Sequence, residues 1–227
     1  MKKFNFILIA IFSLILTSCN FTENIEVYPD GTGTFALEMD GAGLMAMAGD
    51  KIGKEFGTKK DAKVIDSTFS FKQIFELKND SISKLSLEQQ EALKKLENFV
   101  LRIKMNSESK QLLFSMNTKF NSVNELDEFM GNMSALKDLK ENTNQKDNTA
   151  AMLSSLGVKN TKLSFSYDGK NFTRKAIVLK DQIKSTSSAD SLGMAKMFFA
   201  SSKYTFKYHY PKPVKSVSNP DALFSAD

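Results

Sequence analysis

The stretch FVLRIKMNSESKQLLFSMNTKF, residues 99–120, decides the expected fold more than any other part of the chain. Its first half alternates apolar residues with Val100, Arg102 and Lys104, and its second half continues the alternation after a polar turn at 106–110. A period of two indicates a strand that is buried on one face. Two such runs joined by a short polar segment predict an antiparallel hairpin with one apolar and one mainly polar face.

An earlier hairpin is predicted over residues 23–40. Its first strand has Ile25 and Val27 on one face, and its second strand has apolar residues at every other position from Phe35 to Met39. The joining segment Pro29-Asp30-Gly31-Thr32 has turn chemistry, because Pro presets φ and Gly accepts a positive φ.

A later hairpin is predicted around Asp168-Gly169, a dipeptide that strongly favours a two-residue loop between strands. With that loop, Tyr167 pairs with Lys170 and Phe165 faces Phe172. Apolar and aromatic residues alternate with serines before the loop, which supports a half-buried strand there.

Two capping boxes predict helices, because in each a Ser side chain accepts a backbone N–H and a Gln or Glu three residues later reaches back. Ser86-Leu-Glu-Gln89 opens a helix from 87 to about 98, with Leu93 and Leu96 buried. Ser122-Val-Asn-Glu125 opens a second helix with an apolar stripe wide enough to cover a sheet. That stripe consists of Val123, Leu126, Phe129, Met130, Met133 and Leu136.

Shorter elements complete the pattern. A short strand is expected at 64–71, a short helix at 71–77, and either a packed helix or a mobile apolar flap at 41–49. A further helix follows the Ser-rich residues 185–190. The last strand has an aromatic face of Tyr204, Phe206, Tyr208 and Tyr210. This order of hairpins and helices predicts an α+β fold, with an antiparallel sheet built from hairpins and helices packed on one face.

The N-terminus has the layout of a secretory leader. Lys2 and Lys3 precede an apolar run at 4–16, which is shorter than the roughly 20 residues that a spanning helix needs. The run ends in Leu16-Thr17-Ser18-Cys19, and Cys19 is the only Cys in the chain. The expected organisation is therefore a lipoprotein signal peptide at 1–18 and one globular domain at 19–227. An ordinary cleaved leader, with Cys19 as a buried or incidental thiol, is the alternative.

Charge and composition exclude some function classes. The net charge of +5 falls to +3 when Lys2 and Lys3 leave with the leader, and mixed charges spread along the chain are no nucleic-acid signature. His209 is the only His, so no His-based triad or zinc site is expected. We therefore expect no catalytic residue, no metal and no cofactor, and His209 is expected to be an exposed strand residue.

Methionine and aromatic residues suggest one candidate binding site. Met is flexible and fills irregular cores or adaptable apolar surfaces. Ordinary core is one interpretation of the predicted helical methionines, and the tyrosine face of the last strand can equally pack on a helix. The sharper interpretation is an apolar groove for an acyl chain or other hydrophobic ligand. Its candidate residues are Met130, Met133, Met194, Met197, Tyr204 and Tyr208.

Three sequence features together resemble a known group. They are the Leu-Thr-Ser-Cys19 segment, the run from Glu26 to Gly33 (Glu-x-Tyr-Pro-Asp-Gly-Thr-Gly) followed by Leu37-Glu-Met-Asp40, and the run Tyr-Pro-Lys-Pro-Val-Lys-Ser-Val-Ser-Asn from Tyr210. The first resembles the bacterial lipobox. Together they resemble lipoproteins of Bacteroidota and, more loosely, the LppM-like domain of mycobacterial lipoproteins.

The resemblance implies an α+β domain outside the inner membrane and transfers no catalytic residue. It implies that Cys19 takes a diacylglycerol on its thiol and that the new amine is acylated after cleavage. Asn20 is no strong inner-membrane retention signal, so we expect outer-membrane anchoring on the periplasmic face. The relatives continue through a further strand, whereas this sequence stops at Asp227, so a C-terminal truncation stays open.

The resulting functional expectation is a non-enzymatic envelope lipoprotein that acts as a structural or interaction module. Its expected partners are the membrane, through the N-terminal lipid, and an envelope protein. The alternative is a carrier or sensor of a lipid or other hydrophobic ligand. An enzyme acting on envelope polymers ranks last, because the sequence has no catalytic motif.

Overall fold

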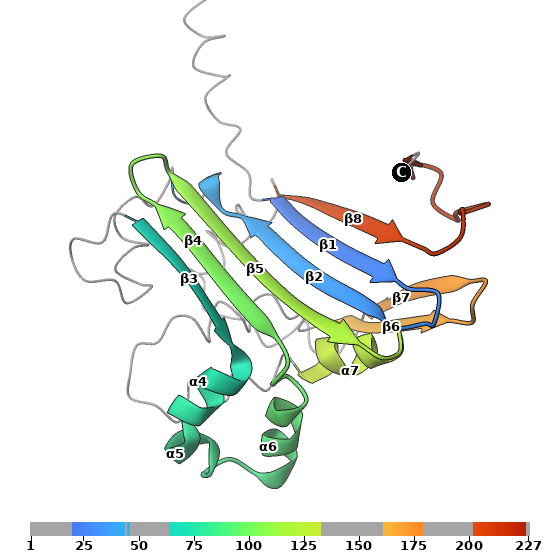
Figure 1. Ribbon diagram of the computed structural model, residues 1–227. Coiled ribbons are helices and arrows are strands. Elements are labelled where there is room, and N and C mark those ends of the chain that lie inside the picture. Colours follow the sequence, from blue (N-terminus) through green and yellow to red (C-terminus); the bar gives the residue numbers. More distant parts are fainter. Residues whose placement is uncertain (1–19, 44, 46–63, 133–160, 179–201, 226–227) are drawn as a thin grey trace, which may run out of the picture.

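The computed structural model describes residues 20–43, 45, 64–132, 161–178 and 202–225. Within them, a six-stranded sheet in the order β3-β4-β5-β2-β1-β8 lies beside a two-stranded sheet, β6-β7 (Figure 1). The strands of the larger sheet are β1 (Asn20–Val27), β2 (Gly33–Asp40), β3 (Val64–Ser70), β4 (Val100–Asn106), β5 (Gln111–Phe120) and β8 (Lys203–His209). The smaller sheet is a hairpin of β6 (Thr161–Tyr167) and β7 (Phe172–Val178).

Most strand pairs are antiparallel, which confirms the predicted mixed fold with an antiparallel-dominated sheet. The expectation of hairpin pairing throughout is wrong for β8, which pairs parallel with β1. A parallel pair requires a long connection between its two strands, and residues 28–202 separate β1 from β8. In this register Tyr204 lies beside Phe21 and Tyr208 beside Ile25, so the aromatic face of β8 extends the apolar face of β1.

The strand register defines two ends of the six-stranded sheet. What we call the Asn20 end comprises Asn20, Asp40, Val64, Asn106, Gln111 and Lys203. The opposite, or Val27, end comprises Val27, Gly33, Ser70, Val100, Phe120 and His209. The described helices and the β6-β7 hairpin gather toward the Val27 end (Figure 1).

One face of the six-stranded sheet forms the core, as the period-two patterns predict. Residues at alternate positions are buried in β1, β2, β4 and β5, and the helices and β6 add side chains to the same cluster. The most deeply buried members include Ile25, Phe35, Phe71, Leu96, Leu101, Phe114, Met116, Leu126 and Phe165. The other face of the sheet is mainly polar.

Four helices are described: α4 (Phe71–Leu77), α5 (Asn79–Ile82), α6 (Leu87–Lys94) and α7 (Glu125–Asn132). The predicted strand at 64–71 and helix at 71–77 are confirmed as β3 and α4, and a capping box at Ser70, which the sequence analysis did not identify, starts α4. The predicted box at Ser86 is also confirmed. Helix α6 ends earlier than predicted, because i→i+3 turns through Phe99 redirect the chain into β4 while Leu93 and Leu96 remain buried.

The second predicted capping box is wrong in its details. The carboxylate of Glu125 accepts the backbone N–H of Asn121 at 3.1 Å, one residue before the expected partner Ser122. The apolar stripe of this helix is confirmed where it is described, since Val123 and Leu126 are buried and Phe129 packs on the core. Leu136 lies outside the described residues, as do most of 41–49 and all of 185–199.

The loop of the β6-β7 hairpin is shifted by one residue from the prediction. Asp168 donates its backbone N–H to the carbonyl of Asn171 at 3.3 Å, so Gly169, with φ of +86°, and Lys170 form the loop. The Asp168 carboxylate stabilises this turn by accepting the N–H groups of Lys170 at 2.8 Å and Asn171 at 2.6 Å. As a result, Phe165 faces Arg174 and not Phe172.

Candidate functional site

The structure describes only part of the predicted apolar groove. Met130, in α7, packs against the main core and is partly buried. Tyr204 and Tyr208 are four residues apart in β8, so both side chains lie on its inner face. Met133, Met194 and Met197, and the predicted lipidation site Cys19, lie outside the described residues.

A buried carboxylate brings the two tyrosines together. The side chain of Glu23, in β1, is on the core face and 1% exposed. Its Oε1 accepts the Tyr208 hydroxyl at 2.7 Å and Arg174 Nε at 3.0 Å. Its Oε2 accepts Arg174 Nη2 at 3.1 Å and the Tyr204 hydroxyl at 3.2 Å. We call Glu23, Arg174, Tyr204 and Tyr208 the buried ion cluster.

Aromatic rings surround the cation of this cluster. The Arg174 guanidinium carbon lies 4.5 Å from the ring centroid of Phe206 and 5.7 Å from that of Phe165. Both positions allow a cation–π attraction, which is stronger where water is excluded. The β6-β7 hairpin therefore docks on β1 and β8 through one bidentate ion pair enclosed by apolar surface.

The cluster raises the pKa of three of its groups. Burial raises the pKa values of Tyr204 and Tyr208, and the negative charge and hydrogen bonds of Glu23 raise them further. Burial disfavours the charge on Arg174, but its hydrogen bonds to Glu23 and the negative charge of Glu23 together outweigh this effect and raise its pKa. Both tyrosines thus remain neutral donors and Arg174 remains a cation.

The hydrogen-bonding pattern favours a structural role for Glu23. An ionised carboxylate offers about four acceptor sites. Two guanidinium donors and two hydroxyl donors occupy them here, so the carboxylate has no open acceptor site for a substrate. The cluster joins three elements that are far apart in sequence.

The sequence analysis missed Glu23 as a site residue because it named only Ile25 and Val27 on one face of this strand. A usable pattern was present, since Glu23 lies between Phe21 and Ile25 at an inward position of the alternating strand. A charge at an inward position is rarely buried without a partner. Arg174 could not be identified as that partner, because the sequence does not show that the β6-β7 hairpin docks on β1, 151 positions away.

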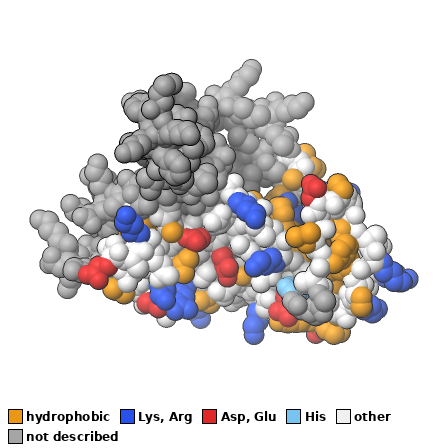
Figure 2. Space-filling view, turned by 90° about the horizontal axis from the view of Figure 1, so that it is seen from above, with side chains coloured by type: hydrophobic (Ala, Val, Ile, Leu, Met, Phe, Trp, Pro, Cys, Tyr) orange, Lys and Arg blue, Asp and Glu red, His pale blue; other side chains and the backbone are white. Residues whose placement is uncertain are grey.

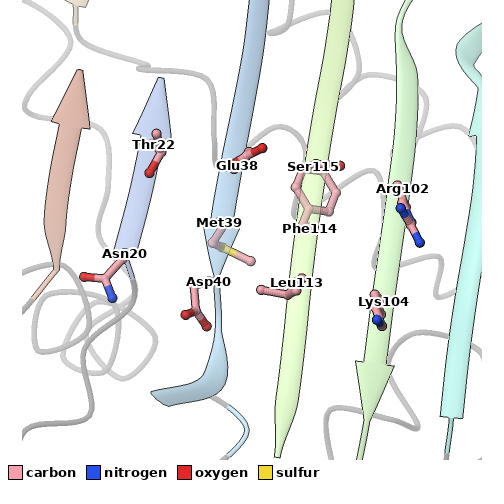
Figure 3. Close-up of a pocket in the computed structure, with 10 residues that line it drawn as sticks. All are labelled: Asn20, Thr22, Glu38, Met39, Asp40, Arg102, Lys104, Leu113, Phe114 and Ser115. Carbon is pink, nitrogen blue, oxygen red and sulfur yellow. The ribbon is translucent and has the colours of Figure 1, made fainter. Parts of the chain in front are cut away.

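A second candidate site is an open depression of about 460 Å³ on the polar face of the sheet, near the Asn20 end (Figure 3). Its lining residues come from four neighbouring strands: Asn20, Thr22, Glu38, Met39, Asp40, Arg102, Lys104, Leu113, Phe114 and Ser115. We call it the polar depression. It combines two cations on β4 with two carboxylates on β2, so it matches a ligand that has both charges.

Arg102, at one side of the polar depression, already has an acidic partner. Its Nε and Nη2 donate to the two carboxylate oxygens of Asp66, on β3, at 3.0 Å and 2.9 Å. The hydrogen bond from Arg102 lowers the pKa of Asp66, and the same contact raises the pKa of Arg102. Both side chains remain about half exposed, so this pair is accessible to water and to salt.

The surface around these sites has both signs of charge. Figure 2, which views the molecule from above the orientation of Figure 1, shows basic and acidic side chains interspersed over the described surface. His209 is exposed on the polar side of β8, as expected.

Among the described residues, no group of three His, Cys, Asp or Glu side chains is placed to hold a metal ion. No described helix combines the length and the apolar character that spanning a bilayer would require.

Comparison of the chain with protein-family models, with curated proteins and with solved structures gave no match. We therefore infer the function from the residues themselves. We use the Cys19 segment of the sequence and the geometry at the Asn20 end of the sheet.

Proposed function

We propose that this chain is a bacterial envelope lipoprotein, anchored through Cys19, whose α+β domain is a non-enzymatic structural or interaction module. The observation on which the proposal rests is the Leu16-Thr17-Ser18-Cys19 segment after a basic and then an apolar stretch. Every described strand and helix follows Cys19 in the sequence, so cleavage before Cys19 would retain all of them.

Lipidation at Cys19 accounts physically for stable anchoring. Each buried CH₂ contributes about 0.8 kcal/mol, and a single acyl chain alone gives only marginal binding. A diacylglycerol on the thiol and an acyl chain on the new amine together make release very slow. We place the protein at the outer membrane, facing the periplasm, because Asn20 offers no strong retention signal.

The buried ion cluster and the described helices support the proposal of an interaction module. The most unusual charged group, Glu23, is saturated by Arg174 and two tyrosines, which suits a structural tether. We further propose that helices cover the core face of the sheet, as α4, α6 and α7 begin to do through core residues Phe71, Leu93 and Leu126. The proposed partners are the membrane and another envelope protein.

The anchor is tested by Cys19→Ala in the native host. We expect the variant to be released from the membrane fraction or to remain unprocessed, with the leader attached. Ser18→Ala is the matched control, because it keeps a small residue before the cleavage site and should leave processing and retention unchanged. A mature-sized Cys19→Ala product that stays in the membrane fraction would contradict the lipid anchor.

A carrier of hydrophobic ligands is the second candidate. Exposed apolar surface on β8 favours it, since Tyr204 and Phe206 are 44% and 48% exposed. Native mass spectrometry of the lipidated protein, released from detergent micelles, separates the two functions. A stoichiometric noncovalent lipid adduct would support the carrier, whereas the mass of the covalent lipoprotein alone would support the interaction module.

A further inference from the structure

No linker separates the proposed lipid anchor from the sheet. Asn20, the residue bonded to Cys19, is already the first residue of β1 and is paired with Asp40 on one side and Lys203 on the other. Consecutive Cα atoms are about 3.8 Å apart across a trans peptide bond. An acylated Cys19 in the bilayer interface therefore holds the Asn20 end of the sheet within a few ångströms of the headgroups.

The side chains on β8 at this end suit an interface between lipid and water. Lys203 is exposed, and the adjacent Tyr204 is 44% exposed with its ring stacked on Phe21 at a centroid distance of 6.0 Å. Tyrosine is enriched at the headgroup level of membranes. The hydroxyl of Tyr204 donates to buried Glu23, so the exposed surface of this side chain is its ring. Lysine side chains reach from such positions to lipid phosphates.

The polar depression lies at the same end and has the matching charges. Arg102 and Lys104 on β4 suit a phosphate, whereas Glu38 and Asp40 on β2 suit an ammonium group (Figure 3). A zwitterionic phospholipid headgroup has both groups. Asp66 already pairs with Arg102, so three carboxylates accompany two cations here, which is a poorer match to a purely anionic headgroup.

We propose that the Asn20 end of the six-stranded sheet rests on zwitterionic phospholipid headgroups, with the polar depression against them. In this orientation the strands run obliquely away from the bilayer, tilted so that the polar face at the Asn20 end turns toward the headgroups. The Val27 end, with α4 to α7 and the β6-β7 hairpin, points toward other envelope components. The inference rests on the proposed lipid anchor and adds the orientation of the domain.

The orientation is tested with single cysteines along β5. Cys19 is the only Cys and would be blocked by lipid, so an introduced Cys is the only free thiol. Leu113→Cys, Asn117→Cys and Lys119→Cys all lie exposed on the polar face. At about 3.4 Å per residue they span about 20 Å from the Asn20 end toward the Val27 end.

Each lipidated, full-length variant is labelled with a fluorophore and placed in vesicles of phosphatidylcholine and phosphatidylethanolamine that contain a headgroup-linked quencher. We expect the strongest quenching at 113, weaker quenching at 117 and little at 119. Glu38→Cys and Thr34→Cys repeat the comparison on β2, and they decide the result if a β5 variant does not fold. Quenching should be stronger at 38 than at 34.

Equal quenching at all positions of vesicle-bound protein, or stronger quenching at 119, would overturn the orientation while leaving the anchor intact. Failure of the lipidated protein to float with the vesicles would overturn the anchor, and with it the orientation. Quenching that follows the expected order only when anionic lipid is added would overturn the assignment to zwitterionic headgroups.

Discussion

Two bidentate ion pairs in this protein have nearly the same geometry and opposite surroundings. Arg174 and Glu23 meet at 3.0 Å and 3.1 Å, and Arg102 and Asp66 meet at 3.0 Å and 2.9 Å. In the first pair the arginine and carboxylate side chains are 21% and 1% exposed, and in the second they are 53% and 44% exposed. Only the environment differs substantially between them.

The position of an ion pair in the fold determines how much the fold depends on it. Asp66 and Arg102 lie on β3 and β4, which are already joined by backbone hydrogen bonds. Exposed ion pairs of this kind contribute little to the free energy of unfolding. Glu23 and Arg174 join two different sheets, and each charge depends on the other for its solvation. Removing one buried partner is costly, although the intact pair need not be more stable than an apolar replacement.

The largest effect is expected from Glu23→Gln, which removes the buried negative charge with almost no change in shape. Arg174 is then left charged and without its counterion, so we expect a loss of about 3–5 kcal/mol in the free energy of unfolding. Urea denaturation measures it, and Asp66→Asn is the matched control in the exposed pair. Similar values for the two variants would contradict the distinction between the pairs.

The double variant Glu23→Leu, Arg174→Leu tests whether the loss in Glu23→Gln comes from the unpaired charge of Arg174. It removes both charges, so no buried charge is left unpaired, and apolar side chains face the rings of Phe165 and Phe206. The hydroxyls of Tyr204 and Tyr208 lose their acceptor, so we expect the double variant to recover only part of the stability lost in Glu23→Gln. A loss as large as that of Glu23→Gln would show that the intact pair is itself a net source of stability.

A smaller effect is expected from Tyr208→Phe, which deletes the 2.7 Å hydrogen bond to Glu23 Oε1. A hydrogen bond to a charged group contributes about 1.5–3 kcal/mol, and thermal unfolding measures the loss. Tyr204→Phe is the control, since its hydrogen bond is longer, at 3.2 Å, and its side chain is more exposed. A larger loss for Tyr204→Phe would contradict this ranking.

The same tyrosines predict an alkaline limit to stability. Their pKa values are raised in the folded protein, so the neutral forms are favoured there. The resulting stability is fully present below the unfolded pKa of about 10 and is lost as the pH rises above it. Unfolding curves between pH 8 and about pH 11 measure this loss, which should be smaller in Tyr208→Phe. An identical pH dependence in wild type and variant would contradict the raised pKa of Tyr208 in the folded protein.

The smallest effect is expected from Asp66→Asn. The pKa of Asp66 is lowered by Arg102, so its contribution is present above the unfolded pKa and is lost as the pH falls through the folded value. Because the pair is open to solvent, we expect almost no change in the melting temperature at neutral pH, and a smaller change still in high salt. A large drop would show that the pair holds β3 in place.

The local elements of this fold were predictable because they depend on neighbouring residues. Alternating apolar residues located the first hairpin and β4 to β5, and Ser86 with Gln89 located the start of α6. The hairpin at Asp168 was predicted with a one-residue error, because the asparagine at 171 and the aspartate at 168 close the turn together. A shift of one residue changes which side chains meet across the strands.

The strand pattern, the short helices and the Cys19 segment can be identified from the sequence, because each depends on residues within about ten positions. The parallel pairing of β8 with β1, and the burial of Glu23 against Arg174, 151 positions later, are evident only in the folded protein. Pairing between distant segments depends on which surfaces remain to be covered after the local elements form. That information is distributed over the whole chain and is absent from any single stretch of it.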